Sequence, residues 1–122
     1  MENETKPAAP RRVIHRFEVP KACRGEGDAP TSIGLYELTA REELGAAKQA
    51  KNDPVRLAAA LVRASLATWD DKPVDRAGGE DETLWNQMGA RLRNLVMAAY
   101  AKVNTAGEDD TSDFLGTHQA RV

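Results

Sequence analysis

Apolar and polar residues alternate near the start of the chain, and this alternation predicts a β-strand over residues 13–19. Charged residues dominate one face of the expected strand, and the other face consists of Val13, His15, Phe17 and Val19. Pro20 ends the pattern, and a loop rich in glycine and proline follows it. A β-compatible run over residues 33–38 predicts a second strand, which we expect to pair antiparallel with the first.

A capping box marks the start of the first predicted helix. Thr39 and Glu42 have the spacing at which two side chains satisfy free amide groups at a helix N-terminus. The helix is expected to continue to about Lys51. Its apolar face is thin and consists of Leu44, Ala47 and Ala50.

A second helix start follows at once, because Asp53 can cap a helix and Pro54 fits its first position. Apolar residues cover nearly the whole surface of the expected helix over residues 55–69. We therefore expect this helix to be the central and most buried element. Residues 70–80 are interpreted as a loop with room for a small hairpin around residues 72–74.

The clearest helical pattern lies in residues 85–103, where apolar residues recur at steps of three and four. Gly89 interrupts the pattern and is expected to divide it into a short helix and a long one. Residues 108–115 have room for one or two further helical turns.

These patterns predict a mainly α-helical α+β fold, namely a small helical bundle with one short antiparallel strand pair near the N-terminus. We expect a single α-rich domain over residues 12–116, a disordered tail at residues 1–11 and a second tail at residues 117–122. The residues expected at the centre of the packing are Val62, Leu66, Trp69, Trp85, Leu92 and Val96.

Composition narrows the function classes. The 122 residues carry a formal net charge of −2, which argues against a generic binder of nucleic acid or of membrane surfaces. The lone Cys23 excludes an intramolecular disulfide. No apolar run has the length of a membrane span, and residues 1–10 lack the apolar stretch of a signal peptide. We therefore expect a cytosolic chain.

Candidate chemistry is sparse. His15, His118 and Cys23 are too few to build a typical zinc site, and the more economical interpretation is a strand histidine, a tail histidine and an incidental thiol. Acidic pairs lie in loops and at helix starts, where they solvate the chain and complement the helix dipole. We expect no catalytic residues, no cofactor and no metal, and hence no enzymatic activity.

A basic stretch over residues 11–24 has a local charge of about +4 and includes Arg11, Arg12 and Arg16. It is the basis for one alternative, a small nucleic-acid-binding regulator with Phe17 as a stacking group. However, Arg12 and Arg16 fall on the strand face opposite Phe17, so a solvated strand face explains the stretch better.

Phe114 and Leu115 follow an acidic segment and have little periodic apolar company. Two interpretations are open at this point. The pair folds back to cover the helical bundle, or it forms an exposed anchor for a partner protein.

The order of segments resembles a known family. A basic-apolar strand, RVIHRFEVP at residues 12–20, precedes GLYELTAREEL at residues 34–44, and later come WNQMGARLRNLVMAAY at residues 85–100 and FLGTHQARV at residues 114–122. In this order the chain resembles the small tail assembly chaperones of long-tailed bacteriophages and prophages. The resemblance spans about residues 12–122.

The resemblance implies a non-enzymatic function in the cytoplasm of the bacterial host. Such chaperones bind the tape-measure protein, keep its apolar helices soluble and recruit tail-tube subunits during virion morphogenesis, and self-association is a further option. Many exist as a short and a frameshifted long form, and this chain would be the short form. Phe114 and Leu115 are then the expected partner-binding residues. The alternative within the same size class is a structural virion component, either a connector or a minor tail protein.

Overall fold

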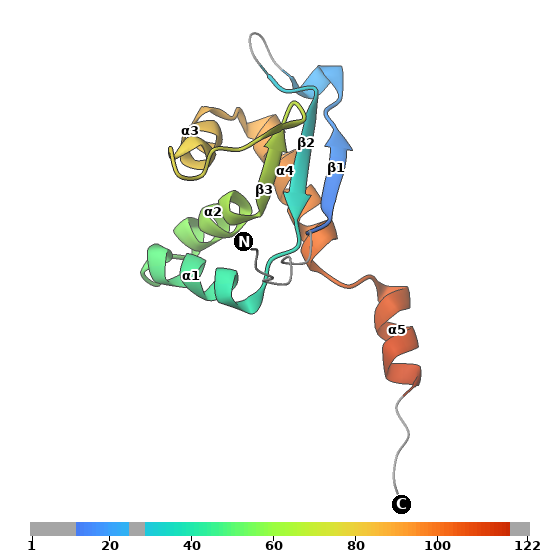
Figure 1. Cartoon of the computed structure of the whole chain (residues 1–122). Helices are drawn as coiled ribbons and strands as arrows, with labels where there is room; N and C mark the ends of the chain where they lie inside the picture. The colour runs from blue at the N-terminus through green and yellow to red at the C-terminus, as the bar shows by residue number, and fades with distance from the viewer. Residues whose placement is uncertain (1–11, 25–28, 118–122) are drawn as a thin grey trace, which may run out of the picture.

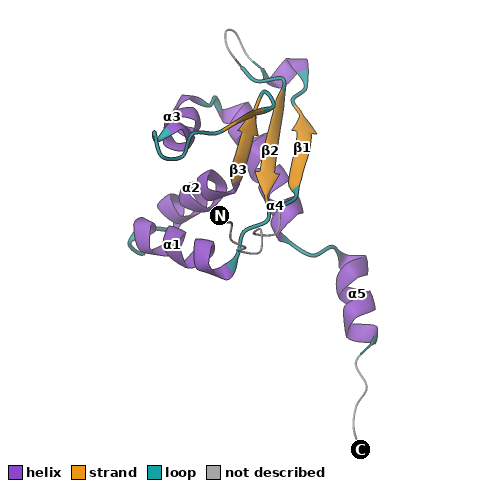
Figure 2. Ribbon diagram, in the orientation of Figure 1, coloured by secondary structure: helices purple, strands orange, loops and turns teal. Residues whose placement is uncertain are grey.

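The computed structural model describes residues 12–24 and 29–117, and 57% of it is helical. Figures 1 and 2 show a small antiparallel sheet with helices packed around it, so the predicted α+β fold is confirmed. The tail predicted at residues 1–11 and residues 118–122 of the second tail lie outside the described residues. In chain order the elements are β1 (Ile14–Glu18), the 3-10 helix η1 (Lys21–Cys23), β2 (Ser32–Tyr36), α1 (Ala40–Ala50), α2 (Pro54–Ser65), β3 (Leu66–Trp69), β4 (Lys72–Pro73), α3 (Glu80–Gln87), α4 (Ala90–Asn104) and α5 (Glu108–Gly116).

The sheet has the strand order β1-β2-β3-β4, and every neighbouring pair is antiparallel. The predicted pairing of the first two strands is confirmed, with Ile14 opposite Tyr36 and Glu18 opposite Ser32. The strand face that consists of Val13, His15, Phe17 and Val19 is only partly buried. Val19 is buried and Phe17 is half-buried, whereas Val13 and His15 are exposed.

A third strand replaces the last turn of the predicted second helix, so the expectation of a helix over residues 55–69 was wrong at its C-terminal end. Helix α2 ends at Ser65, and β3 continues directly from it to pair with β2. Asp70 and Asp71 both have left-handed backbones, with φ of 54° and 64°, and they connect β3 to β4. Two positive φ values in succession suit a two-residue hairpin turn. A hairpin is therefore present close to the expected residues 72–74. Its first strand is β3, where the sequence predicts the end of a helix, and its second strand is β4.

The expected starts of α1 and α2 are confirmed. Thr39 and Glu42 form a reciprocal capping box at α1, and the Asp53 side chain accepts hydrogen bonds from two backbone amides at the start of α2. The end of α2 has a partner that the sequence did not indicate. Arg76 donates to the carbonyl oxygens of Arg63 and Ala64, each at 2.9 Å, and to that of Leu66. A guanidinium at this place satisfies carbonyl groups that a helix end leaves free.

Helices α1 and α2 pack together through alanines. Ala46 and Ala50 of α1 and Ala60 of α2 are buried, which lets the two backbones approach closely. The apolar face predicted for α1 was therefore wrong in part, because Leu44 is 58% exposed and Ala47 is exposed as well. The buried alanines lie four residues apart, as one face of a helix requires.

The core lies between β2, α2 and α4, and α4 lies across one face of the sheet (Figure 1). The most buried element is the central strand β2 rather than α2, because both its neighbours in the sheet and the helix α4 cover it. Of the six residues expected at the centre, Trp69 and Trp85 are partly buried against the core. The other four belong to the fully buried cluster of Val19, Ile33, Leu35, Val62, Leu66, Met88, Leu92 and Val96.

Candidate partner-binding site

Helix α5 is the element that stands out from the fold, because it lies apart from the rest of the molecule (Figure 1). Residues 105–107 connect it to α4, and Thr105 and Gly107 at the two ends of this connection have extended backbones. The expected division at Gly89 is confirmed, because α3 ends at Gln87 and Gly89 is the N-cap of α4. Helix α5 follows the C-terminal end of α4. The helical turns expected at residues 108–115 are confirmed as α5.

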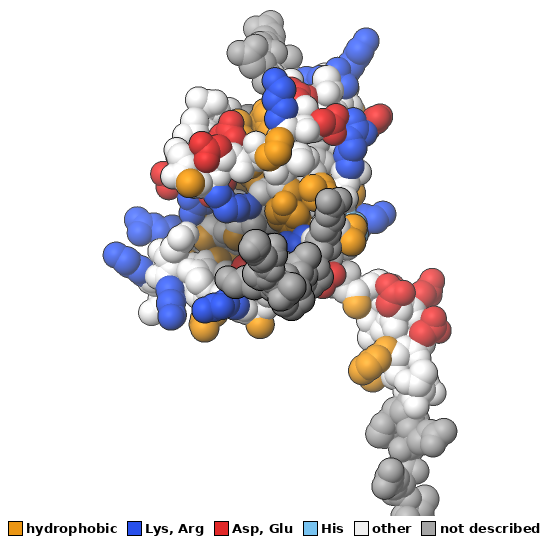
Figure 3. Space-filling model, viewed as in Figure 1, with side chains coloured by type: hydrophobic (Ala, Val, Ile, Leu, Met, Phe, Trp, Pro, Cys, Tyr) orange, Lys and Arg blue, Asp and Glu red, His pale blue; other side chains and the backbone are white. Residues whose placement is uncertain are grey.

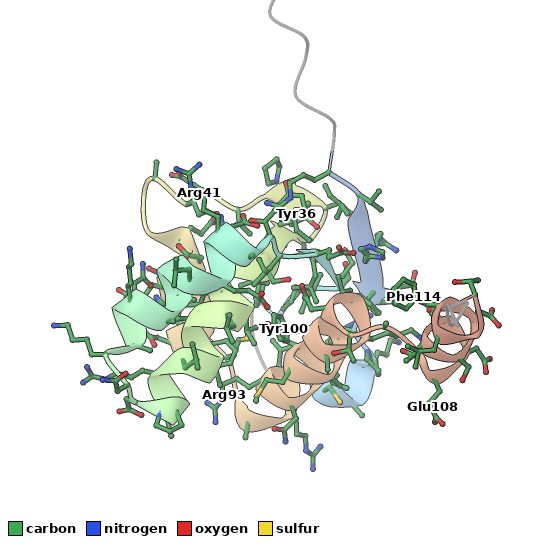
Figure 4. The ribbon with its side chains drawn as sticks, turned by 90° about the horizontal axis from the view of Figure 1, so that it is seen from below. Tyr36, Arg41, Arg93, Tyr100, Glu108 and Phe114 are labelled. Carbon is green, nitrogen blue, oxygen red and sulfur yellow. The ribbon has the colours of Figure 1, made fainter. Side chains whose placement is uncertain are left out.

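Phe114 and Leu115 are exposed to solvent on α5, at 74% and 61%. The structure therefore does not place this pair over the helical bundle. Acidic residues occupy the first turn of the same helix, where they complement the helix dipole, and they consist of Glu108, Asp109 and Asp110. Figure 4 shows Phe114 and Glu108 on different sides of α5, and Figure 3 shows the acidic and apolar side chains gathered separately. The short helix is thus amphipathic and presents an unpacked apolar side.

An apolar groove lies between β1 and α4. It has a volume of about 340 Å³, and its mostly apolar lining includes Phe17, Ile33 and Leu95. Lys102 of α4 lies at one end of the groove, near the connection to α5. Sequence reasoning missed this groove, because the alternating pattern places Phe17 on one face of a strand but does not show what lies against that face.

Three arginines of the basic stretch bind acceptor groups of the same chain. The guanidinium of Arg12 donates to both carboxylate oxygens of Glu42, at 2.7 Å and 2.8 Å, and lies 4.4 Å from the centre of the Tyr36 ring. Arg16 binds the Asp71 carboxylate with its Nε at 2.8 Å, and Arg24 donates its Nε to the Val19 carbonyl at 3.0 Å. These contacts favour a structural role for the stretch over a surface for phosphate groups. Arg11 lies outside the described residues.

The carboxylates that meet these arginines titrate below their ordinary range. The hydrogen bond from Arg12 lowers the pKa of Glu42, and the hydrogen bond from Arg16 lowers the pKa of Asp71. Hydrogen bonds from the backbone and hydroxyl of Thr31 lower the pKa of the neighbouring Asp70. In their charged forms, Glu42 joins α1 to the residue pair before β1, Asp71 joins the β3–β4 turn to β1, and Asp70 joins that turn to the segment before β2.

The described structure does not bring the histidines and the cysteine considered for a metal site together. His15 lies exposed on β1, Cys23 is half-buried beside the core, and His118 lies outside the described residues. Within residues 12–24 and 29–117, no group of three or more His, Cys, Asp or Glu side chains is arranged to hold a metal ion.

In the same two segments, no helix combines the length and the apolar character needed to cross a membrane. Comparisons of the chain with protein-family models, with curated proteins and with solved structures find no match. The partner-binding interpretation therefore depends on the geometry of α5 and on the resemblance in segment order.

Proposed function

We propose that this protein is a tail assembly chaperone that binds apolar helical segments of a phage tape-measure protein and brings tail-tube subunits to them. The observation that supports this proposal is the exposed Phe114–Leu115 pair on a helix that lies apart from the body. A chaperone for long apolar helices needs apolar surface that is accessible without being buried in its own core. The resemblance of the chain's segments to such chaperones points to the same class of partner.

The composition of α5 suits reversible capture. Phe114 offers a large apolar area, and aromatic side chains commonly dominate the free energy of protein–protein contacts. Four carboxylates lie on the same helix, and Asp113 directly precedes the aromatic ring in the chain. Their charge keeps an exposed apolar pair soluble and opposes unselective association between copies. The helix can therefore offer its apolar side to a client without causing aggregation.

The proposal is tested by co-expressing the full chain with a helical tape-measure fragment from its own phage or prophage. We expect the fragment to stay soluble and to co-purify with the chain. Phe114→Ala should weaken capture about tenfold, which corresponds to about 1.4 kcal/mol, because it removes most of the apolar contact area. The melting temperature should stay nearly unchanged, since the ring is 74% exposed.

Val55→Ala is the matched control, because Val55 is 79% exposed on α2 and lies outside the proposed contact. It should leave both capture and melting unchanged. Loss of thermal stability in Phe114→Ala, with capture per folded molecule unaltered, would assign the ring a purely structural role. A wild-type chain that neither solubilises nor co-purifies with the fragment would overturn the proposed function. Mass spectrometry of purified particles separates a chaperone, which should be absent, from a virion component.

A further inference from the structure

We propose that strand β1 binds an extended apolar peptide of a partner protein, which pairs with β1 as an antiparallel strand and places alternate side chains in the groove between β1 and α4. This inference goes beyond the proposed function, because it concerns an extended segment and a surface other than α5. Strand β1 is the outermost strand of the sheet (Figure 1), and within residues 12–24 and 29–117 it pairs with β2 alone. One side of its backbone is therefore available to a further strand.

The hydrogen bonds of the sheet show which backbone groups of β1 point outward. The Val19 N–H donates to the Thr31 carbonyl at 2.8 Å, so Val19 turns its backbone groups toward the second strand. The carbonyl of the next residue, Ser32, instead accepts from the Asp70 N–H at 2.9 Å and so points toward the end of β3. These directions alternate along antiparallel strands. The β1 residues whose N–H and C=O groups point away from β2 are therefore Ile14, Arg16 and Glu18.

The two edges of the sheet differ in how open they are. Strand β4, at the opposite edge, has two residues and one of them is Pro73. A short edge strand with a proline resists pairing with another chain. Strand β1 has five residues and no proline, its pairing with β2 runs without a shift in register, and all of its residues except Phe17 are exposed. Strand β1 is thus the edge at which the sheet can be extended.

The groove gives an added strand a place for its side chains. Its lining includes Phe17 and Glu18, which are consecutive on β1 and point to opposite faces, so the groove reaches the edge of the strand. On the other side of the groove the lining includes Leu95, Ala98 and Lys102 of α4. The lining holds one base and one acid, and their formal charges cancel. We therefore expect the groove to accept uncharged apolar side chains.

The edge and the groove together select an extended peptide from another protein. A helix uses its backbone N–H and C=O groups internally, so it cannot pair with the edge. A second copy could offer its own β1, but Phe17 of that strand already lines the groove of its own copy, and both grooves would stay unfilled. In the chain's own first residues, Pro7 and Pro10 have no N–H to donate. A separate strand with apolar residues at every second position fills the groove and pairs with the edge.

Antiparallel pairing links the face on which a side chain lies to the direction of its backbone groups. Phe17 lies opposite Ile33, and both line the groove, so the outward-bonding residues of β1 have their side chains on the other face. Residues of an added strand that bond to β1 share that other face. The residues between them direct their side chains into the groove and their N–H groups away from β1. A probe peptide in which threonine and valine alternate should therefore place valines in the groove and bond to β1 through its threonines.

The probe is a fluorescent peptide of seven alternating threonine and valine residues, with a lysine at each end for solubility. The purified full chain is titrated into it while the fluorescence anisotropy is measured. N-methylation of the threonines removes the N–H groups that bond to β1, and we expect it to weaken binding at least about tenfold. N-methylation of the valines is the matched control and should change affinity by less than about twofold. Equal affinity for the two methylated peptides, or no binding of the unmethylated one, would overturn the proposal.

Two pairs of variants test the same contact from the protein. Glu18→Pro removes an outward N–H at an edge position that tolerates proline, whereas Glu18→Ala removes the same carboxylate and keeps the N–H. The proline variant should weaken binding at least about fivefold relative to the alanine variant. Ala98→Trp fills the groove and should weaken binding at least about tenfold, whereas Ala47→Trp, on the exposed side of α1, should not. Equal binding by the two tryptophan variants contradicts the proposal, even where Glu18→Pro fails to fold.

Sedimentation of the full chain without peptide tests the alternative occupant. A dimer that becomes a monomer in Glu18→Pro but not in Glu18→Ala would assign the edge to a second copy and overturn the peptide as its partner. Phe114→Ala should bind the probe as the wild type does, because α5 lies apart from the sheet (Figure 1). Probe binding and tape-measure capture are therefore separate measurements, and failure of either one leaves the other standing.

Discussion

Gly34 shows how a single missing side chain shapes the sheet. It lies in the central strand at a shift in register between β2 and β3. A Cβ atom at this position would lie 2.6 Å from Cγ2 of Ile14 and would also collide with the Thr68 hydroxyl. The side chains of β1 and β3 therefore meet over the glycine, and the strands need this residue for reasons of space.

We expect Gly34→Ala to lower the free energy of unfolding by about 1–3 kcal/mol, because the added methyl group forces its neighbours apart. Chemical denaturation measures the change. Gly45→Ala is the matched control, since a Cβ there meets no atom within 4 Å and Gly45 lies inside helix α1. The control should stabilise the protein by up to about 1 kcal/mol. Equal effects of the two variants would show that the close approach at Gly34 does not matter.

The lowered pKa values of Glu42, Asp70 and Asp71 make stability depend on acidity. A carboxyl whose pKa is lower in the folded state than in the unfolded state stabilises the fold while it is charged. This contribution is complete above the unfolded pKa of about 4 and is lost as the pH falls through the folded value. We therefore expect the melting temperature to fall as the pH is lowered from about 5 to about 3.

Asp71→Asn should make this dependence on pH shallower, because it removes one of the carboxylates and its ion pair with Arg16. Asp109→Asn, on α5 and away from the sheet, serves as the control. The expectation fails if Asp71→Asn and the wild type lose the same number of degrees over that pH range.

Helices α1 and α2 could be predicted because their starts carry local capping signals, whereas strand β3 could not. A capping box or an Asp-Pro pair decides a helix start through hydrogen bonds within a few residues, so Thr39 and Asp53 were assigned correctly. Leu66 and Trp69 continue the apolar spacing of α2, yet they form a strand because β2, about thirty residues earlier, offers them a partner. The local signal available was the Asp70–Asp71 pair, whose residue type tolerates left-handed turns.

The packing of helix α4 against the sheet contributes to the stability of the fold. Leu92 is 6% exposed and lies in the core between α4 and the sheet. Leu92→Ala should lower the free energy of unfolding by about 2–5 kcal/mol, since it leaves a cavity. Leu44→Ala, at a leucine that is 58% exposed on α1, should change it by less than about 0.5 kcal/mol. A melting temperature unchanged by Leu92→Ala would place the core elsewhere.

For the whole molecule, the fold class could be predicted from the sequence, and Phe114 could be singled out as a residue that is exposed in the structure, but the groove could not be predicted. The exposed pair could be singled out because its segment lacks apolar neighbours at helical spacing. The groove joins Phe17 near the start of the described chain to Lys102 near its end, so it exists only once β1 and α4 are in place. The apolar pattern on β1 and α4 does not distinguish a side chain that is covered from one that lines a groove.

The separation of α5 from the body has a consequence for local dynamics. An isolated helix of nine residues is shorter than the roughly 12–15 residues that hold a helix together in water, so α5 opens and closes independently of the core. Its amide hydrogens then exchange with solvent through local opening, while those of β2 exchange only when the core opens. A partner that packs against Phe114 slows hydrogen exchange in α5 and leaves exchange in β2 unaffected. The exchange rates of the α5 amide hydrogens therefore report how much of the protein has a partner bound at this helix.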